Sequence, residues 1–322
     1  SGVIEEVFDV AYKWLGRIPG GLAVATVVAS TVLAAMVGVI GAAVVTMALV
    51  ALPSMLRRGY SPVLAVGTVM AGGTLGILIP PSVLAIVYGL VANQSVGELY
   101  LGSVFPGLVL SGLYILFSVG YALLNPKAAP RLSPEETPTW SERWRALRSI
   151  WSPLVLIFLV LGTIFLGLAA PTEAAAIGAF GAMVVAAIHR RLSWTILRLA
   201  LEQTAKATAM VMWIVFGANA FVGFYIAQGG DRYVSELLLG TGLSPWGILL
   251  LMQGILIVLG MFLGWVGILL LAVPVFVPIL RDLGFDPLWF GVLYLVNMQI
   301  SFLSPPFGYA LFYVRGVAPQ VP

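Results

Sequence analysis

The sequence predicts an all-α polytopic membrane protein built on an inverted repeat, and three observations carry this prediction. Of the 322 residues, 61% are hydrophobic and only 9% are charged, and the mean hydropathy is +1.06. An ordinary soluble domain has about 25% charged residues, and a soluble fold cannot bury so much apolar surface. The 36 glycines and 20 prolines favour broken or hairpin helices over plain spanning rods. Finally, a pattern of prolines and glycines recurs late in the chain.

The N-terminal quarter of the chain reads as three elements. Residues 1–18 alternate apolar with charged side chains, which predicts an amphipathic helix at the membrane interface, and the segment 1–21 ends in Pro-Gly-Gly. Residues 22–52 are apolar with Gly38 and Gly41 in the middle, as in a re-entrant helical hairpin. Residues 63–92 form a span interrupted from Gly76 to Ser82. We take 22–92 as the first repeat.

Connecting spans follow over residues 93–244, and a second repeat over 245–316. The predicted spans are 99–124, 150–169, 173–188 and 207–228. A proline-rich, charged cytoplasmic loop lies at 125–149 and an amphipathic arm at 192–206. The second repeat has a hairpin at 245–280 around Gly264 and Gly267, and a span at 287–314 broken at Ser304-Pro305-Pro306. A short tail, 317–322, remains.

The basic residues support this layout. If each hairpin enters and leaves the membrane on the same side, 14 of the 16 Lys and Arg residues lie on one side of the membrane, and only Arg232 and Arg281 lie on the other. The positive-inside rule then makes the crowded face cytoplasmic.

The repeat has a constant separation of 225 residues (from 62 to 287, and from 80 to 305). The matched positions are Pro53 and Pro278, Gly59 and Gly284, Tyr60 and Phe285, Pro62 and Pro287, and Pro80-Pro81 and Pro305-Pro306. An odd number of predicted crossings separates the two hairpins, so the second unit is inverted, as in many secondary transporters. Broken helices free backbone polar groups at mid-membrane, and two such breaks predict a polar site there. The alternative is that the prolines are packing kinks.

Four motifs stand out along the chain: Gly-Thr-Leu-Gly-Ile-Leu-Ile-Pro-Pro-Ser at 73–82, Leu-Arg-Arg-Gly-Tyr at 56–60, Pro-Thr-Glu-Ala-Ala-Ala at 171–176 and Ser-Pro-Pro-Phe-Gly at 304–308. In combination they resemble one family, the large membrane subunit of TRAP (tripartite ATP-independent periplasmic) transporters. The resemblance covers nearly the whole chain. Family members normally carry further spans before and after these segments, so a chain truncated at both ends is expected.

The resemblance implies a sodium-driven, elevator-type importer of a small organic solute, mostly of the carboxylate class. It also implies two partners, a small four-span membrane subunit and a periplasmic substrate-binding protein. The chain is then a non-enzymatic, multi-pass protein of the bacterial or archaeal inner membrane, embedded in the lipid bilayer, with sodium as coupling ion, no other cofactor and no nucleic-acid partner.

Candidate site residues lie at the breaks and the hairpin tips. For substrate, they are Asn297, Gln299, Ser301, Ser304, Thr74 and Ser82. For sodium, they are the Thr74 hydroxyl and the carbonyls of Gly38, Gly41, Gly76, Gly264 and Gly267, because sodium is a hard cation that prefers oxygen ligands. The alternatives are that Thr74 and Ser82 bond back to their own backbone, and that Asn297 and Gln299 make interhelical hydrogen bonds.

Four other residues have local interpretations. Glu173 is expected to stabilise the start of a helix, with Thr172 as its cap. His189 is expected to stabilise the C-terminus of a helix as a cation. Asn219 is a candidate path-lining residue, and Trp265 at the second tip is either a gate or a lipid-facing wedge.

Other function classes fit less well. A channel predicts a ring of charged residues or a repeated pore helix, and an intramembrane enzyme predicts paired carboxylates or a His-Glu-x-x-His motif; the sequence shows neither. Without cysteine, a disulfide scaffold, a Cys-ligated metal and a thiol nucleophile are excluded. The remaining rival is a stand-alone, ion-coupled dicarboxylate-type carrier with the same inverted hairpins.

Overall fold

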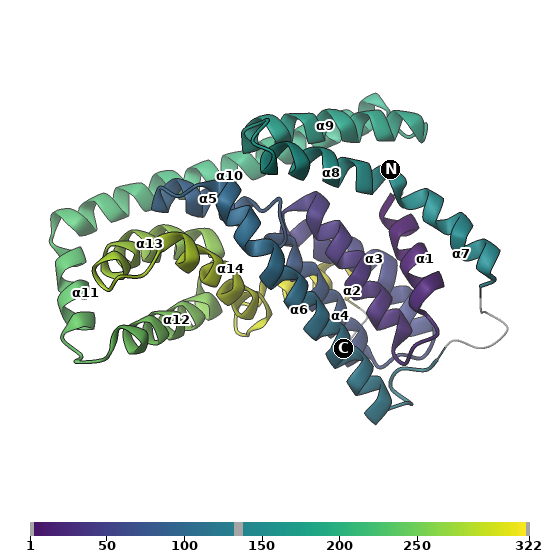
Figure 1. Ribbon diagram of the computed structural model, residues 1–322, viewed down its shortest axis with the longest axis horizontal. Coiled ribbons are helices and arrows are strands. Elements are labelled where there is room, and N and C mark those ends of the chain that lie inside the picture. The colour runs from purple at the N-terminus through teal and green to yellow at the C-terminus, as the bar shows by residue number, and fades with distance from the viewer. Residues whose placement is uncertain (1–2, 132–137, 320–322) are drawn as a thin grey trace. The chain divides into compact units, whose positions relative to one another are not determined.

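The fold is helical throughout the part of the chain that the computed structural model describes, residues 3–131 and 138–319 (Figure 1). Within these ranges there is no strand, and seven helices are long and apolar enough to cross a membrane. The predicted all-α polytopic class is therefore confirmed. Residues 132–137 of the predicted loop and 320–322 of the tail lie outside the described residues.

The chain divides into two compact units. The first holds residues 1–83, 103–191 and 309–322, and the second holds residues 84–102 and 192–308. Each unit therefore contains one hairpin and the first half of that hairpin's own broken helix. The helix that follows each break belongs to the other unit.

The first unit opens with α1 (Val3–Leu15), followed by the hairpin helices α2 (Gly21–Val37) and α3 (Ile40–Arg57). Gly38 closes α2 with φ +66°, a left-handed conformation that a β-carbon disfavours, and α3 begins two residues later. Both hairpin helices pack against α4 (Pro62–Thr74), which continues as the 3₁₀-helix η1 (Leu75–Ile77) and then breaks.

The rest of the first unit is a set of longer helices. It comprises most of α6 (Val96–Leu124), then α7 (Trp140–Leu147), η3 (Arg148–Ile150), α8 (Trp151–Phe165), α9 (Pro171–Ile188) and α15 (Tyr309–Val317). Helices α8 and α9 lie side by side, as predicted for a close pair (Figure 1). Helix α15 packs on α3 and α4.

One expectation at the start of α9 is wrong. The helix begins at Pro171 with Ala170 as its N-cap, so Thr172 is already helical and does not cap it. The Glu173 carboxylate fills that role by accepting from the Ala170 N–H at 2.9 Å. His189 lies at the C-terminus of α9 as predicted, and its ring N–H donates to the Val185 carbonyl at 2.8 Å.

The second unit holds most of α5 (Val83–Ala92), together with α10 (Trp194–Ala227), α11 (Gly230–Leu239), the hairpin helices α12 (Pro245–Phe262) and α13 (Trp265–Asp282), and α14 (Pro287–Leu303). Helix α12 packs along α14, and α10 packs on α13. Tyr88 of α5 stacks on Tyr294 of α14, with ring centroids 5.9 Å apart, and donates a hydrogen bond to the Pro287 carbonyl at 2.6 Å.

The structure repeats at the separation that the sequence predicts. Both ends of α13 lie 225 residues after the ends of α3, and α14 begins 225 residues after α4. Gly59 and Gly284 have left-handed φ angles of +77° and +81°, so the turn that joins each hairpin to its broken helix has one conformation in both copies. Both Pro-Pro pairs carry a cis peptide bond. The re-entrant course of the hairpins in a membrane stays a prediction.

Three segments differ from the simple reading of the sequence. The amphipathic arm at 192–206 and the span at 207–228 form one continuous helix, α10. Helix α7 lies inside the segment predicted as a loop, where Thr139 and Glu142 form a capping box. Helix α11 occupies a segment for which no helix was predicted.

Candidate functional site

The second unit holds three predicted site residues on one buried stretch of α14. Asn297, Gln299 and Ser301 lie in the last two turns of this helix, just before the break, and each is at most 5% exposed. Their helix is otherwise apolar, so these side chains are buried against protein at a considerable desolvation cost. Asn297 and Ser301 are four residues apart and share the face that meets α12, where Gln253 faces Asn297, whereas Gln299 lies on another face of the helix.

Asn297 and Gln253 connect the two helices. The Asn297 Nδ2 amide donates to Gln253 Oε1 at 2.7 Å and to the Gln253 backbone carbonyl at 3.0 Å. Gln299 donates to the Leu295 carbonyl of its own helix at 3.3 Å. The predicted alternative for Asn297, an interhelical hydrogen bond, is therefore observed, although it uses only part of the side chain.

Hydrogen-bonding capacity remains on these four side chains. Four buried atoms have no partner among the described residues: Gln253 Nε2, Asn297 Oδ1, Gln299 Oε1 and Ser301 Oγ. Buried polar atoms in folded proteins are nearly always paired, so a concentration of unpaired atoms requires an explanation such as a bound ligand, ion or water. Together they offer an amide donor, two carbonyl acceptors and a hydroxyl.

Close packing at Gly260 brings the two helices together. A β-carbon added to Gly260 of α12 would lie 1.9 Å from Ser301 Oγ, far closer than any real contact. Only glycine allows α12 to approach α14 this closely, and this approach places Ser301 beside the hairpin. In the first unit the equivalent helices, α2 and α4, have the glycine and the serine exchanged. Gly72 lies on α4 and faces Ser30 Oγ of α2.

The break after α14 contacts the tip of its own hairpin. The Phe307 N–H, directly after Pro305-Pro306, donates to the Met261 carbonyl at 3.0 Å. Ser304 bonds back to the Ile300 carbonyl at 2.8 Å. The Trp265 backbone carbonyl accepts from Tyr294 Oη at 3.2 Å, so the start of α13 is held against α14.

The carbonyls of the second tip are already partly used. Gly264 is the N-cap of α13, and its carbonyl accepts from the Ile268 N–H at 3.0 Å. Gly267 lies inside α13, with open space where a β-carbon would be.

The first unit makes an equivalent contact between hairpin tip and break. The Val83 N–H donates to the Gly38 carbonyl at 3.3 Å, and a β-carbon on Gly38 would lie 2.4 Å from the Pro81 carbonyl oxygen. Gly76 is close to Val39, the residue between the two hairpin helices. The prediction that Gly38 faces the first break is therefore confirmed.

The other residues of the first set are placed as follows. Thr74 and Ser82 are fully buried, and their hydroxyls donate to the carbonyls of Ala71 and Ile77. These are the local bonds that the alternative interpretation predicts, and Thr74 also interacts with the Tyr114 hydroxyl. Gly41 does not contact this group closely, because its Cα faces the Tyr313 ring of α15.

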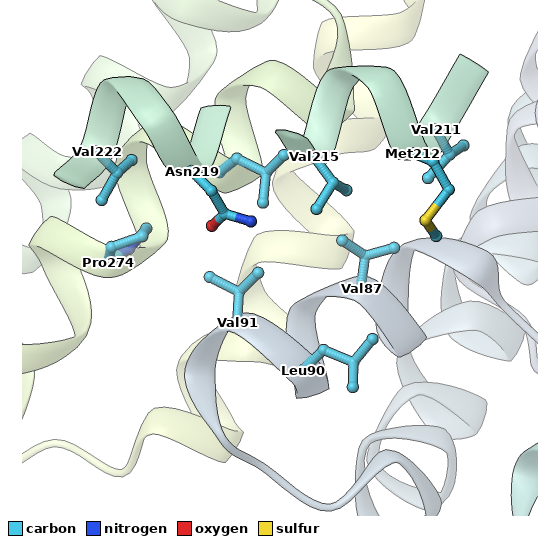
Figure 2. A pocket seen from close by; sticks show the side chains of 10 residues that line it. Val87, Leu90, Val91, Val211, Met212, Val215, Asn219, Val222 and Pro274 are labelled. Carbon is cyan, nitrogen blue, oxygen red and sulfur yellow. The ribbon is translucent and has the colours of Figure 1, made fainter. Parts of the chain in front are cut away.

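Asn219 lines a separate cavity of about 430 Å³ in the second unit, formed by α5, α10 and α13 (Figure 2). Its amide points into the cavity, and the remaining lining consists of Val, Leu, Met and Pro side chains (Figure 2). None of the predicted substrate residues of α14 lines this space. An apolar cavity with one amide is a poor match for a charged solute.

Two residues of these sites were not found from the sequence. Gln253 carries the same signal as Asn297 and Gln299, a lone amide in an apolar helix, and it lies seven residues before Gly260 on the same helix. Tyr313 has no comparable signal, because its position against α3 depends on α15 packing in the unit of the first hairpin.

Comparison with known proteins identifies the family. The DctM component of the tripartite ATP-independent periplasmic transporters matches residues 1–322. The C4-dicarboxylate TRAP transporter large permease protein DctM of Pseudomonas aeruginosa is 35% identical over 318 residues, which covers 98% of this chain and 73% of the relative. The sialic acid TRAP transporter large permease protein SiaM of Vibrio cholerae is 31% identical over 98% of this chain and 73% of the relative.

A third relative, the 2,3-diketo-L-gulonate TRAP transporter large permease protein YiaN of Escherichia coli, is 29% identical over 99% of this chain and 74% of the relative. These relatives are transport permeases rather than enzymes, and they are inner-membrane proteins. The predicted resemblance is confirmed, and this chain belongs to the DctM family, the large permease subunits of TRAP transporters.

Proposed function

We propose that this chain is the large permease subunit of a sodium-coupled TRAP transporter that imports a small organic carboxylate. In this proposal a periplasmic binding protein delivers the solute, and a small four-span subunit completes the membrane part. The solutes for which the relatives are named support the carboxylate class, since they include C4-dicarboxylate, sialic acid and 2,3-diketo-L-gulonate.

The observation that carries the proposal is the set of unpaired buried atoms on Gln253, Asn297 and Ser301, where α12 meets α14. The Gln253 Nε2 amide and the Ser301 hydroxyl could donate to a carboxylate, and the Asn297 carbonyl could accept from a hydroxyl group of the solute. Gln299 Oε1, also buried and unpaired but on another face of α14, is assigned to a further contact with the solute. We assign Ser304, at the end of the same helix, to the edge of this substrate site. A site of neutral donors fits a solute that must be released as well as bound, because charged pairs would hold it more tightly.

The cation is assigned to the contact between hairpin tip and break in the first unit. The Gly38 carbonyl accepts from the Val83 N–H at the long distance of 3.3 Å, and the buried hydroxyl oxygens of Thr74 and Ser82 lie on either side of the break in the sequence. These are oxygen ligands, which a hard cation such as sodium requires. The Gly76 carbonyl completes the cation ligands proposed in this unit. The carbonyls of Gly264 and Gly267 are assigned to a separate cation site at the tip of the second hairpin.

Reconstitution tests the proposal directly. The complete transporter, in vesicles with an imposed sodium gradient, should take up a labelled C4-dicarboxylate only when the binding protein is present, and replacing sodium by potassium should abolish uptake. A panel with sialic acid and ectoine would reveal another substrate class. Uptake by the permease alone would contradict the proposal and favour the stand-alone carrier.

A further inference from the structure

Arg143 of α7 is a buried cation without a counter-charge in the described part of the chain. Its side chain is 6% exposed, and its guanidinium Nε and Nη2 have no hydrogen-bond acceptor there. Arginine stays protonated in proteins, so it cannot avoid the cost of burial by losing its charge. A buried, unpaired charge is among the least favourable arrangements in a folded protein, and an anion from outside the chain would remove the cost.

Arg143 belongs to a cluster with three tryptophans. The guanidinium carbon of Arg143 lies 5.1 Å from the centroid of the Trp140 ring, a cation–π contact. Trp14 of α1 meets Trp140 and Trp144 edge-on, with centroids 6.2 and 5.7 Å apart, and its indole N–H donates to the Arg143 carbonyl at 3.3 Å. Trp140 and Trp144 are 65% and 61% exposed, so apolar rings form the rim of the cluster.

The position of the cluster indicates which anion is available. Helix α7 runs through η3 into α8, and together they form one candidate membrane span, Trp140–Phe165, with Arg143 in its first turn. Tryptophan side chains concentrate at the level of the lipid headgroups, and the anion present there in quantity is phosphate. Arg145 and Arg148 follow on the same segment, and clusters of basic residues beside a span attract anionic lipids.

The described carboxylates of α1 and α7 leave one intrachain rival for Arg143. Glu142 accepts from the Thr139 N–H at 2.7 Å in the capping box, Asp9 pairs with Lys13, and Glu5 is exposed. Glu6 of α1 is the rival, because it has a buried Oε2 without a partner among the described residues.

We propose that Arg143, framed by Trp14, Trp140 and Trp144, binds the phosphate of an anionic phospholipid. The planar guanidinium fork suits bidentate contact with phosphate oxygens. Because Trp140 is largely exposed, its ring is free to turn aside and open one edge of the guanidinium to the headgroup, while the indoles cover the adjoining apolar part of the lipid.

The test uses the full protein in nanodiscs made from phosphatidylethanolamine with or without phosphatidylglycerol, with retained lipid counted by native mass spectrometry. Arg143→Gln should weaken phosphatidylglycerol retention by about tenfold or more, because charge-assisted hydrogen bonds are lost. Arg145→Gln removes the same charge from an exposed position on the same helix, and it should have little effect. Equal losses in both variants would mean diffuse attraction and would overturn the proposal.

Further variants and measurements keep the proposal falsifiable if Arg143→Gln folds poorly. Arg143→Lys keeps the charge but loses the planar guanidinium group, so phosphatidylglycerol retention should fall several-fold while remaining measurable. Unchanged phosphatidylglycerol retention in this variant overturns the proposal. Inorganic phosphate should not displace the lipid, and displacement would identify a free-phosphate site instead. If Arg143→Gln and Glu6→Gln lower thermal stability equally and leave lipid retention intact, an intrachain ion pair replaces the proposal. If Arg143→Gln no longer binds the small subunit but still retains the lipid, Arg143 contacts a protein partner, and the lipid proposal is overturned.

Discussion

Asn297 donates through one nitrogen to both oxygens of Gln253, to Oε1 at 2.7 Å and to the backbone carbonyl at 3.0 Å. This two-point contact joins the first helix of the second hairpin to the helix that breaks after it. The remaining atoms, Asn297 Oδ1 and Gln253 Nε2, are buried and unpaired. One pair of amides therefore fixes the position of two helices and still has capacity for a ligand.

Removing either amide should destabilise the fold. Asn297→Leu leaves the buried Gln253 oxygens without their donor and should lower the free energy of unfolding by about 1–3 kcal/mol. The double change Asn297→Leu with Gln253→Leu should cost less than the sum of the single changes, with a coupling of about 0.5–3 kcal/mol. Unfolding in mixed micelles measures both, and Gln203→Leu, at an exposed position of α10, is the control. Strict additivity would show that the contact does not stabilise the protein.

Gln299→Leu should reduce solute affinity more than stability. The change removes the unpaired Oε1 and a single long hydrogen bond within its own helix, at 3.3 Å. Loss of one bond to the solute costs about 0.5–1.5 kcal/mol, or up to about 3 with a charged partner, which is a weakening of about two- to 150-fold. The KM of sodium-driven uptake measures it. Normal expression with unchanged KM would leave Gln299 as a helix-packing residue.

Thr74→Val should shift the sodium dependence of uptake while changing solute affinity less. The substitution keeps the shape of the side chain and removes the buried hydroxyl oxygen that we assign to the cation. Thr68 provides a matched control, because it is also buried in α4 and also bonds to its own helix, at 2.7 Å. The sodium concentration for half-maximal uptake should rise in Thr74→Val and stay constant in Thr68→Val. An equal rise in both would assign the effect to helix packing.

Gly260→Ala should be costly where Gly254→Ala is not. The added carbon at 260 would overlap Ser301 Oγ and Cβ, at 1.9 and 2.3 Å, so α12 and α14 must separate. Overpacking of this kind costs about 1–3 kcal/mol. Gly254, in the same helix, has open space at the same position, and alanine there should be neutral or stabilising by up to about 1 kcal/mol. Thermal stability of the two variants compares them, and equal values would disprove the close approach.

Single cysteines test the topology in this cysteine-free chain. Lys127→Cys, in the segment predicted to be cytoplasmic, should react with a membrane-impermeant maleimide only after the membrane is opened, and Arg232→Cys should react from the periplasm in intact cells. Both positions are exposed, so access is not limited by packing. The reverse pattern would contradict the orientation inferred from the basic residues.

The repeat, the two breaks and most of the α14 cluster were predictable from the sequence, because proline and glycine positions constrain the backbone locally. Pro62 and Pro287 each begin a helix, and Gly59 and Gly284 each supply a left-handed residue three positions earlier. Buried amides in apolar helices are equally conspicuous.

What the sequence did not reveal depends on contacts between distant segments. Gln253 becomes a site residue only through the approach of α12 to α14 at Gly260, and Arg143 becomes buried only through α1 packing on α7. The continuity of α10 was missed because a change from amphipathic to apolar composition does not by itself end a helix, and no proline interrupts residues 194–227.

The exchange of helices after each break has a consequence for the gene. The chain passes between the two units after residues 83, 102, 191 and 308. A cut anywhere between Leu84 and Gly308 therefore leaves both fragments holding parts of both units. Neither unit is therefore encoded by one uninterrupted stretch of the gene, and no single cut within residues 84–308 separates one complete unit from the other.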